Sequence, residues 1–260
     1  QVFDTHSSKY VQQYIFHEED STGIANNWVN YIKRDGDHAM WIGTYGGVSR
    51  IDQMTGKITN YSTKHNILPG NIVLAIEKAK NGAMWFGTTE GLCCFYPDKG
   101  TSVHYSTKDG LAGNVVCAIQ EDEKGDLWIS THSGISRFNP GTKKFLNYYA
   151  FDGLQGNEFS NGASFRSADG ELFFAGIGGV TSFYPREITN KAAVVQLYLT
   201  GLYVLDKKVV EGMKLGWHQI IDGFISDVDK IYLSYDDNMF SLEFSTFDFG
   251  NAESVKIGRA

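Results

Sequence analysis

Marker residues recur along the chain at a nearly constant interval, and this interval limits the folds available to it. Steps of 44, 43 and 45 residues separate an aromatic residue that recurs as Trp41, Trp85, Trp128 and Phe173. Steps of 44, 43 and 43 residues separate Asn27, Asn71, Asn114 and Asn157. Steps of 44 and 43 residues separate Tyr61, Tyr105 and Tyr148. Short apolar runs repeated with one period of this length predict propeller blades.

Each complete repeat unit contains four runs that are typical of β-strands. In the third unit they read VVCAIQED, GDLWIST, GISRFNP and KKFLNYYA, and Gly, Asp, Asn or Lys bounds each run. The segments DEKGD and NPGTK fit hairpin turns, because glycine accepts the positive φ that such turns need. One four-stranded antiparallel sheet cannot cover both of its faces, whereas sheets stacked around an axis cover one another. We therefore expect the recurrent Trp or Phe to lie between blades and the recurrent Asn to cap loops.

The two ends of the repeat region are incomplete. Phe3-Asp4 aligns with Ile51-Asp52 of the next unit, so the chain is expected to begin within a blade. The last unit has three predicted strands, and the missing strand and blades would come from sequence outside this chain. Apolar faces exposed by the incomplete ring would favour association or disorder near residues 1–20. The predicted propeller region, 1–188, comprises a partial blade at 1–16 and blades at about 27–63, 71–107, 114–150 and 157–188.

The period stops near residue 188, and the remaining sequence predicts a second domain. Polar and apolar residues alternate there between Gly and Asp breaks, which is typical of a β-sandwich. The apolar positions of one run, Phe240, Leu242 and Phe244, predict a strand that covers one face of a core. We expect an incomplete β-sandwich over 189–260. The predicted fold class is therefore all-β, with a partial propeller of four-stranded antiparallel blades followed by part of a sandwich.

Composition and charge exclude several kinds of partner and cofactor. The chain is 42% hydrophobic, carries a formal net charge of −7 and has no Lys/Arg-rich tract, which argues against nucleic acid or an anionic membrane as the main partner. Its three cysteines, Cys93, Cys94 and Cys117, have no zinc-like spacing and are expected to be buried thiols. Cys93 and Cys94 are adjacent in a predicted strand and should point to opposite faces. Arg34–His38 is predicted to be a hairpin turn and not a metal site. We predict no catalytic residue, no metal site and no cofactor.

One face of the predicted disc is the candidate ligand site. Adjacent strands run antiparallel, so the loops between units and the GTxxG loops should emerge on the same face. Within these loops the repeat varies, and the variable positions include aromatic and hydrogen-bonding residues. The candidate ligand contacts are Trp28, Tyr45, Glu90, His132 and Glu158. Sugar recognition combines an aromatic plane for C–H groups with polar groups for hydroxyls. The structural alternatives are loop packing for the aromatic residues and solvated or locally bonded side chains for the other three.

The repeat resembles a known family. The segment NVVCAIQEDEKGDLWISTHSGISRFNP is similar to the two-component regulator propeller repeat, and Gly153–Pro185 resembles the last blade of that family's propeller. The segment IYLSYDDNMFSLEFSTFDFGNAE is similar to the start of the Y_Y_Y β-sandwich domain, which follows the propeller in that family. The resemblance implies the periplasmic sensor part of a Bacteroides-type inner-membrane hybrid two-component system. It also implies downstream membrane, histidine kinase and regulator segments, and a homodimer in the full-length receptor.

Three functions from different classes follow from these patterns. The resemblance implies a non-enzymatic sensor of glycan-derived oligosaccharides that signals through the sandwich to a kinase across the membrane. An enzyme acting on glycans, a glycosidase or lyase, is an alternative, and Glu90 and Glu158 are the only carboxylate pair we could nominate for it. A protein-interaction scaffold is the third. The sequence does not identify the ligand.

Overall fold

The computed structural model describes residues 1–18, 22–36, 38–188 and 198–245 of the chain. These residues form two compact units, Gln1–Thr189 and Asn190–Ala260. The regular secondary structure of both units is almost entirely antiparallel strand. Among the described residues, no helix is long and apolar enough to span a bilayer.

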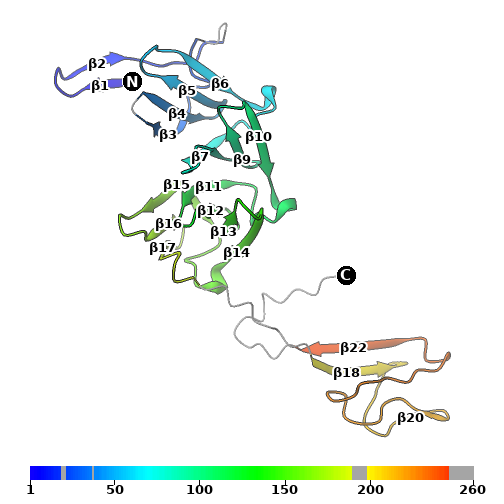
Figure 1. Ribbon diagram of the computed structural model, residues 1–260. Coiled ribbons are helices and arrows are strands. Elements are labelled where there is room, and N and C mark those ends of the chain that lie inside the picture. Colours follow the sequence, from blue (N-terminus) through cyan, green and yellow to red (C-terminus); the bar gives the residue numbers. More distant parts are fainter. Residues whose placement is uncertain (19–21, 37, 189–197, 246–260) are drawn as a thin grey trace. The chain divides into compact units, whose positions relative to one another are not determined.

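The first unit is a succession of antiparallel sheets, each made of strands consecutive in sequence (Figure 1). A two-stranded sheet comes first, made of β1 (Val2–Asp4) and β2 (Lys9–Gln12). The first four-stranded sheet contains β3 (Val29–Asp35), β4 (Ala39–Thr44), β5 (Gly47–Asp52) and β6 (Ile58–Tyr61). The second contains β7 (Val73–Lys78), β8 (Met84–Thr88), β9 (Gly91–Tyr96) and β10 (Thr101–Tyr105). The third contains β11 (Val116–Glu121), β12 (Leu127–Thr131), β13 (Gly134–Asn139) and β14 (Lys144–Tyr148). A three-stranded sheet of β15 (Phe159–Arg166), β16 (Leu172–Gly176) and β17 (Gly179–Phe183) follows.

These sheets have the arrangement of propeller blades, as the repeat predicts. The first strand of each sheet lies beside the first strand of the next, so that β3, β7, β11 and β15 are innermost. Polar contacts link these inner strands, including Lys33 Nζ to Glu77 Oε2 at 2.6 Å and Gln120 Nε2 to Ser164 Oγ at 2.8 Å. The described blades do not close into a ring. We number the blades 1 to 4 from the sheet that begins with β3.

The recurrent tryptophans pack each blade against the next one. Trp41 of blade 1 is fully buried, and its ring centroid lies 5.6 Å from Phe86 and 6.2 Å from Phe95 of blade 2. Trp85 and Trp128 repeat this contact with residues of blades 3 and 4, at 5.7 Å from Phe138 and 4.6 Å from Phe183. The predicted position between blades is confirmed for the three tryptophans. Phe173 of blade 4 is only half-buried, because no further blade covers it among the described residues.

The recurrent tyrosines complete the same clusters. Each lies on the outermost strand of its blade, with a ring centroid 5.5–6.2 Å from the tryptophan of that blade; the residues are Tyr61, Tyr105 and Tyr148. Tyr61 also contacts Phe95 of the following blade at 4.9 Å, and Tyr105 contacts Phe138 at 4.8 Å. The aromatic markers of the repeat therefore meet at the blade interfaces.

All three cysteines are buried free thiols, as predicted. Cys93 belongs to the apolar cluster between blades 1 and 2, whereas Cys94 belongs to the cluster between blades 2 and 3. The two side chains therefore point to opposite faces of β9. Burial raises the pKa of the Cys93 thiol far above its usual range. Burial and the nearby Glu158 raise the pKa of Cys117 to about 12.

The second unit has its own small core. Its sheet contains β18 (Tyr198–Val204), β19 (Lys207–Lys208) and β22 (Phe240–Ser245), and β20 (Lys214–Leu215) pairs with β21 (His218–Gln219). Leu202 and Val204 of β18 are fully buried and pack with residues of the long β19–β22 connection, such as Ile220. The parts of the predicted sandwich at 189–197 and 246–260 lie outside the described residues.

The strand predicted at the end of this unit is present, but its predicted burial is wrong for the described residues. The three apolar side chains of β22 are exposed to 52%, 39% and 45%; they are Phe240, Leu242 and Phe244. The β19–β22 connection covers the apolar residues of β18 and leaves those of β22 more open. The alternating pattern identified the strand and could not show which other segments cover its apolar face.

The buried tryptophans should dominate the stability of the first unit. We expect Trp41→Ala to lower the free energy of unfolding by about 3–5 kcal/mol, because it removes a fully buried ring at the interface between blades 1 and 2. Urea denaturation followed by circular dichroism measures this change. Met54→Ala in the same blade is the matched control, because Met54 is 72% exposed and its truncation should change stability by less than about 0.5 kcal/mol. Equal effects of the two substitutions would contradict the packing described above.

The cysteines should be unreactive in the folded protein. The thiolate is the reactive form, and burial favours the neutral thiol of all three residues. We expect no labelling by Ellman's reagent at pH 8 in buffer and labelling of all three cysteines in denaturant. Because the folded pKa values are raised, the stability that these neutral thiols contribute should be lost as the pH rises above about 9. Rapid labelling of the native protein would contradict the burial.

Candidate ligand-binding face

Two sets of loops lie together on one face of the first unit, which we call the loop face. One set joins the second and third strands of each blade, and the other joins successive blades. Hydrogen bonds of 3.1–3.3 Å connect the two sets at equivalent places, from Tyr45 N to Trp28 O, from Thr89 N to Ile72 O and from His132 N to Val115 O. These contacts confirm the prediction that both sets emerge on the same face.

A buried threonine holds the tight loop of blades 1, 2 and 3 in shape. The Thr88 hydroxyl donates to Gly91 O at 2.8 Å and accepts from Glu90 N at 3.0 Å. Thr44 and Thr131 make the same pair of hydrogen bonds in their own blades. Gly91 has a φ of +137°, and a Cβ there would lie 2.5 Å from Tyr105 O, so only glycine fits. The two residues between Thr and Gly can then vary without changing the loop backbone.

The recurrent asparagines fix the segments between blades, which confirms the predicted loop capping. Asn71, Asn114 and Asn157 each accept, through Oδ1, a backbone N–H of the short 3₁₀ turn after the preceding blade, at 2.7–2.9 Å. These turns are η1 (Thr63–His65), η2 (Thr107–Asp109) and η3 (Ala150–Asp152). Asn27 accepts from Phe16 N at 2.8 Å in the same way. The residue after each asparagine is therefore presented at a defined place on the loop face.

The structure brings two of the five candidate residues into contact. The rings of Trp28 and Tyr45 have centroids 5.4 Å apart and an interplanar angle of 43°. Both rings stay accessible, with Trp28 69% exposed and Tyr45 43% exposed. Trp28 is held by its own backbone N–H, which donates to Asn26 Oδ1 at 2.8 Å. The two rings form a supported aromatic pair that a ligand can contact.

The other three candidates are exposed and lie on separate blades. Glu90 belongs to blade 2, His132 to blade 3 and Glu158 to blade 4. Among the described residues, no hydrogen bond or ion pair joins the side chains of these three. Glu90 lies against Gly70, where an added Cβ would be 2.5 Å from Glu90 Cγ. Glu90 and Glu158 come from blades 2 and 4, with blade 3 between them.

One further residue of this face is absent from the predicted set. Gln155 lies in the segment before blade 4, and its Nε2 donates to Glu158 O at 3.1 Å. Its Oε1 is buried and has no partner in the described part of the chain. The corresponding residue before blade 3 is Ala112. The backbone N–H of Ala112 donates to Ser136 Oγ and that of Gln155 donates to Thr181 Oγ1, each at 2.9 Å. The change from Ala to Gln between two equivalent segments is the sequence signal that could have identified it.

The opposite face of the first unit also holds cavities that the predicted residues do not reach. The larger has a volume of about 420 Å³ and lies between blades 2 and 3. Its lining comes from Trp85 and from the hairpin regions at Ala79–Asn81, Glu121, Glu123–Leu127 and Asn139–Gly141. We call this face the hairpin face. The sequence signal for this cavity is again a departure from the repeat, because Ala79 stands where blades 1 and 3 have Asp35 and Asp122.

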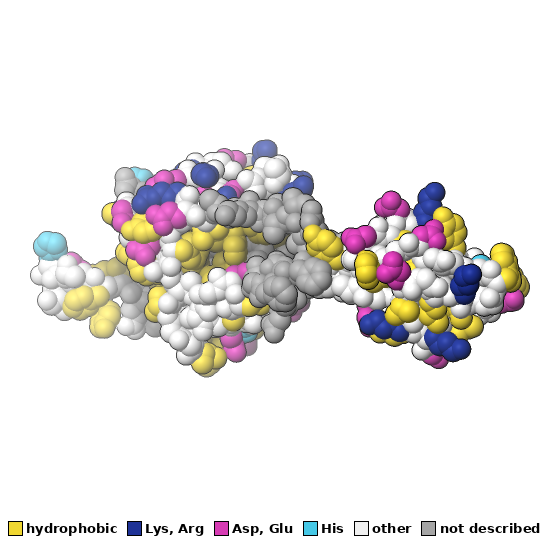
Figure 2. Space-filling view, turned by 90° about the horizontal axis from the view of Figure 1, so that it is seen from below, with side chains coloured by type: hydrophobic (Ala, Val, Ile, Leu, Met, Phe, Trp, Pro, Cys, Tyr) yellow, Lys and Arg dark blue, Asp and Glu magenta, His cyan; other side chains and the backbone are white. Residues whose placement is uncertain are grey.

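The face drawn in Figure 2 has no large patch of a single charge sign. Lys and Arg side chains are interspersed with Asp and Glu side chains on the face drawn in Figure 2. Within the described residues, no group of three or more His, Cys, Asp or Glu side chains is arranged to hold a metal ion. The geometry of the loop face is suited to a ligand bound through aromatic contact and hydrogen bonds.

Comparison with known proteins identifies the repeat. The family model of the two-component regulator propeller matches residues 23–46, 67–90 and 110–133. Each match runs from the segment before a blade to the GTxxG loop, so the chain carries three repeats of this type. No curated protein is significantly similar to the chain.

Solved structures share the fold. A crystal structure described as the extracellular domain of a hybrid two-component system of B. thetaiotaomicron has 24% sequence identity and a TM-score of 0.68, over 91% of this chain and 32% of that one. The extracellular domain of a system described as one-component, from the same organism, has 19% identity and a TM-score of 0.51, over 95% of this chain and 39% of that one. This chain therefore spans about a third of the length of these two structures.

The asparagine caps can be tested in blade 3. We expect Asn114→Ala to lower the free energy of unfolding by about 0.5–1.5 kcal/mol, because the Thr107 N–H loses its acceptor at 2.9 Å. Hydrogen exchange of the Thr107 amide should accelerate in this variant. Asn114→Asp keeps an acceptor oxygen at the same place and is the matched control, with the Thr107 amide staying protected. Unchanged exchange in the alanine variant would show that Asn114 does not hold the turn.

Proposed function

We propose that this chain is part of the periplasmic sensor region of an inner-membrane hybrid two-component system. In this proposal the loop face binds an oligosaccharide derived from a glycan and performs no chemistry. The second unit corresponds to the start of a Y_Y_Y β-sandwich and transmits the signal to a kinase on the other side of the membrane. The full-length receptor acts as a homodimer.

The aromatic pair of Trp28 and Tyr45 is the observation that carries the ligand assignment. An exposed aromatic surface next to polar loop residues matches the two requirements of a sugar, a stacking plane for C–H groups and partners for hydroxyls. The three matched propeller repeats and the fold of the extracellular domains support the sensor role. A sensor responds only when its ligand binds one arrangement better than another, so binding must favour one packing of the receptor.

The separation of the carboxylates favours binding over catalysis. A glycosidase needs two carboxyl groups that flank one bond, about 5–9.5 Å apart. Glu90 and Glu158 instead come from blades 2 and 4, with blade 3 between them. An interaction scaffold would instead use the exposed aromatic residues to contact a protein chain.

Isothermal titration calorimetry against a panel of defined oligosaccharides tests the proposal. We expect saturable binding of at least one oligosaccharide, with no product formed on prolonged incubation. Trp28→Ala and Tyr45→Ala should each weaken this binding by about tenfold, which corresponds to about 1.4 kcal/mol, because each removes one ring of the pair. Met54→Ala, in the β5–β6 turn on the hairpin face, should leave the affinity unchanged.

Three outcomes would contradict the proposal. Release of cleaved sugar would indicate an enzyme. Binding unaffected by both ring substitutions would place the ligand away from the aromatic pair. A protein partner bound in the absence of any sugar binding would indicate a scaffold.

A further inference from the structure

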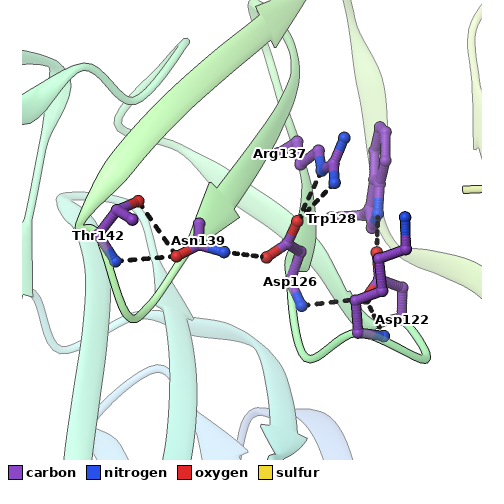
Figure 3. Close-up of polar contacts among 7 residues, drawn as sticks. Asp122, Asp126, Trp128, Arg137, Asn139 and Thr142 are labelled. Atoms are coloured by element: carbon purple, nitrogen blue, oxygen red, sulfur yellow. Dashed lines mark hydrogen bonds and ion pairs between the residues drawn. The ribbon is translucent and has the colours of Figure 1, made fainter. Parts of the chain in front are cut away.

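In two of the three complete blades, the indole N–H of the central tryptophan has a carboxylate partner. Trp41 Nε1 donates to Asp35 Oδ2 at 2.9 Å, and Trp128 Nε1 donates to Asp122 Oδ2 at 3.0 Å (Figure 3). The aspartate stands six residues before the tryptophan in both cases. Burial opposes ionisation of Asp35, but hydrogen bonds from Lys78 and Trp41 outweigh it and hold its pKa below the usual range. The hairpin end of each of these blades therefore contains a built acceptor for the indole.

Blade 2 departs from this arrangement. The residue six positions before Trp85 is Ala79, which has no acceptor in its side chain. Trp85 is only 3% exposed, and its indole N–H donates to no residue in the described part of the chain. The Trp85 indole N–H is therefore open to a water molecule or to a bound molecule that supplies an acceptor.

A cavity of about 420 Å³ opens at this place, lined by both Ala79 and Trp85. We call it the blade 2–3 cavity. The corresponding position between blades 3 and 4 has a cavity of only about 30 Å³, lined by Asp122, Tyr184 and Arg186. The equivalent lining residues of the larger cavity are smaller; they are Ala79, Asn139 and Gly141. The same structural position is thus nearly filled in one blade pair and open in the next.

The polar walls of the cavity are fixed by hydrogen bonds within the protein. Glu121 is 8% exposed, and its Oε2 accepts from Lys80 N at 2.9 Å, whereas its Oε1 accepts no hydrogen bond among the described residues. Asp126 is bound by Arg137 at 2.7 Å and by Asn139 Nδ2 at 2.5 Å, and Asn139 Oδ1 accepts from Thr142 N at 2.8 Å. Figure 3 shows this chain of contacts running from Arg137 to Thr142. Side chains held in this way can present a preformed site.

The charges of the lining favour a neutral ligand. The basic side chains of the lining are Lys80 and Lys124, and its acidic side chains are Glu121, Glu123 and Asp126. The Lys80 ammonium already donates to the carbonyls of Asp122 and Glu123, at 2.8 and 3.2 Å. The lining therefore holds more carboxylates than ammonium groups, which disfavours an anion. A free indole donor and a free carboxylate oxygen together suit a hydroxyl group, which both accepts and donates.

We propose that the blade 2–3 cavity binds a neutral polyhydroxylated small molecule of about the size of a monosaccharide. One hydroxyl oxygen accepts from Trp85 Nε1, and a hydroxyl of the same molecule donates to Glu121 Oε1. The volume lies within the range of about 300–1,000 Å³ that is usual for small-molecule sites. The site is on the hairpin face and does not depend on the loop-face site of the proposed function.

Nitrogen-15 NMR of the tryptophan indoles tests this site, because the chain has only five tryptophans. The probes are glucose, galactose, N-acetylglucosamine and myo-inositol, each titrated into the 260-residue chain. The cross-peak that is lost in the Trp85→Phe variant is assigned to the Trp85 indole N–H. We expect at least one probe to shift the Trp85 cross-peak saturably, while the Trp41 and Trp128 cross-peaks stay in place because their N–H groups are already bound.

Two substitutions separate the site from a general effect on the fold. Ala79→Asp gives blade 2 the acceptor that blades 1 and 3 already have, so it should abolish the titration and move the Trp85 cross-peak in the absence of any probe. Glu121→Gln keeps the shape of the wall and removes its charge, and it should weaken binding by about tenfold. Unaltered Trp41 and Trp128 cross-peaks report that each variant is folded.

The inference would be overturned if none of the four probes shifts the Trp85 cross-peak, or if the shift persists unchanged in Ala79→Asp and Glu121→Gln. The Trp28 indole reports the loop face in the same spectra. A shift of Trp28 alone would support the proposed function and overturn this second site. A shift of Trp85 alone would support the second site, and the oligosaccharide calorimetry would decide the loop face separately.

Discussion

The packing of one tryptophan per blade against the next blade is the interaction on which the propeller unit depends. A four-stranded sheet leaves two apolar faces open, and each tryptophan closes one face of its own blade against the Phe of the third strand of the next. The tyrosine of the outermost strand fills the same interface. Blades therefore stabilise one another through nearest neighbours, and a blade without a following neighbour keeps its aromatic residue, Phe173, partly exposed.

Hydrogen bonds repeated in blades 1 to 3 make the loop face suitable for variation. The threonine and asparagine contacts fix the loop backbones, so that neighbouring side chains can change without loss of the fold. Trp28 and Tyr45 exploit this on the loop face, where they form an exposed aromatic pair. On the hairpin face, Ala79 replaces the aspartate of blades 1 and 3, and the Trp85 indole therefore faces a cavity. Rigid blades with local exceptions are a physically reasonable basis for binding small molecules.

Departures from the repeat carried more information about sites than the repeat itself. The five loop-face candidates were chosen as variable positions, and the structure joined only two of them, because the others come from different blades. The same reasoning applied to the position six residues before each tryptophan would have singled out Ala79. Gln155 in place of Ala112 is a third departure, and the fold buries its side chain. A sequence can show that a position is unusual, but distances between blades and the space beside a side chain depend on packing.

The sequence by itself determined the strands, the four-stranded blades and the capping role of the recurrent asparagines, because these depend on local periodicity. It also determined the burial of the recurrent tryptophans and of the cysteines, because each repeat must bury its own apolar residues. Tertiary structure alone decided which loop residues meet and where a cavity opens. It also decided that β22 keeps its apolar side chains more exposed than the alternating pattern predicts. These outcomes depend on which other segments cover a surface, and alternation along one strand carries no information about its distant neighbours.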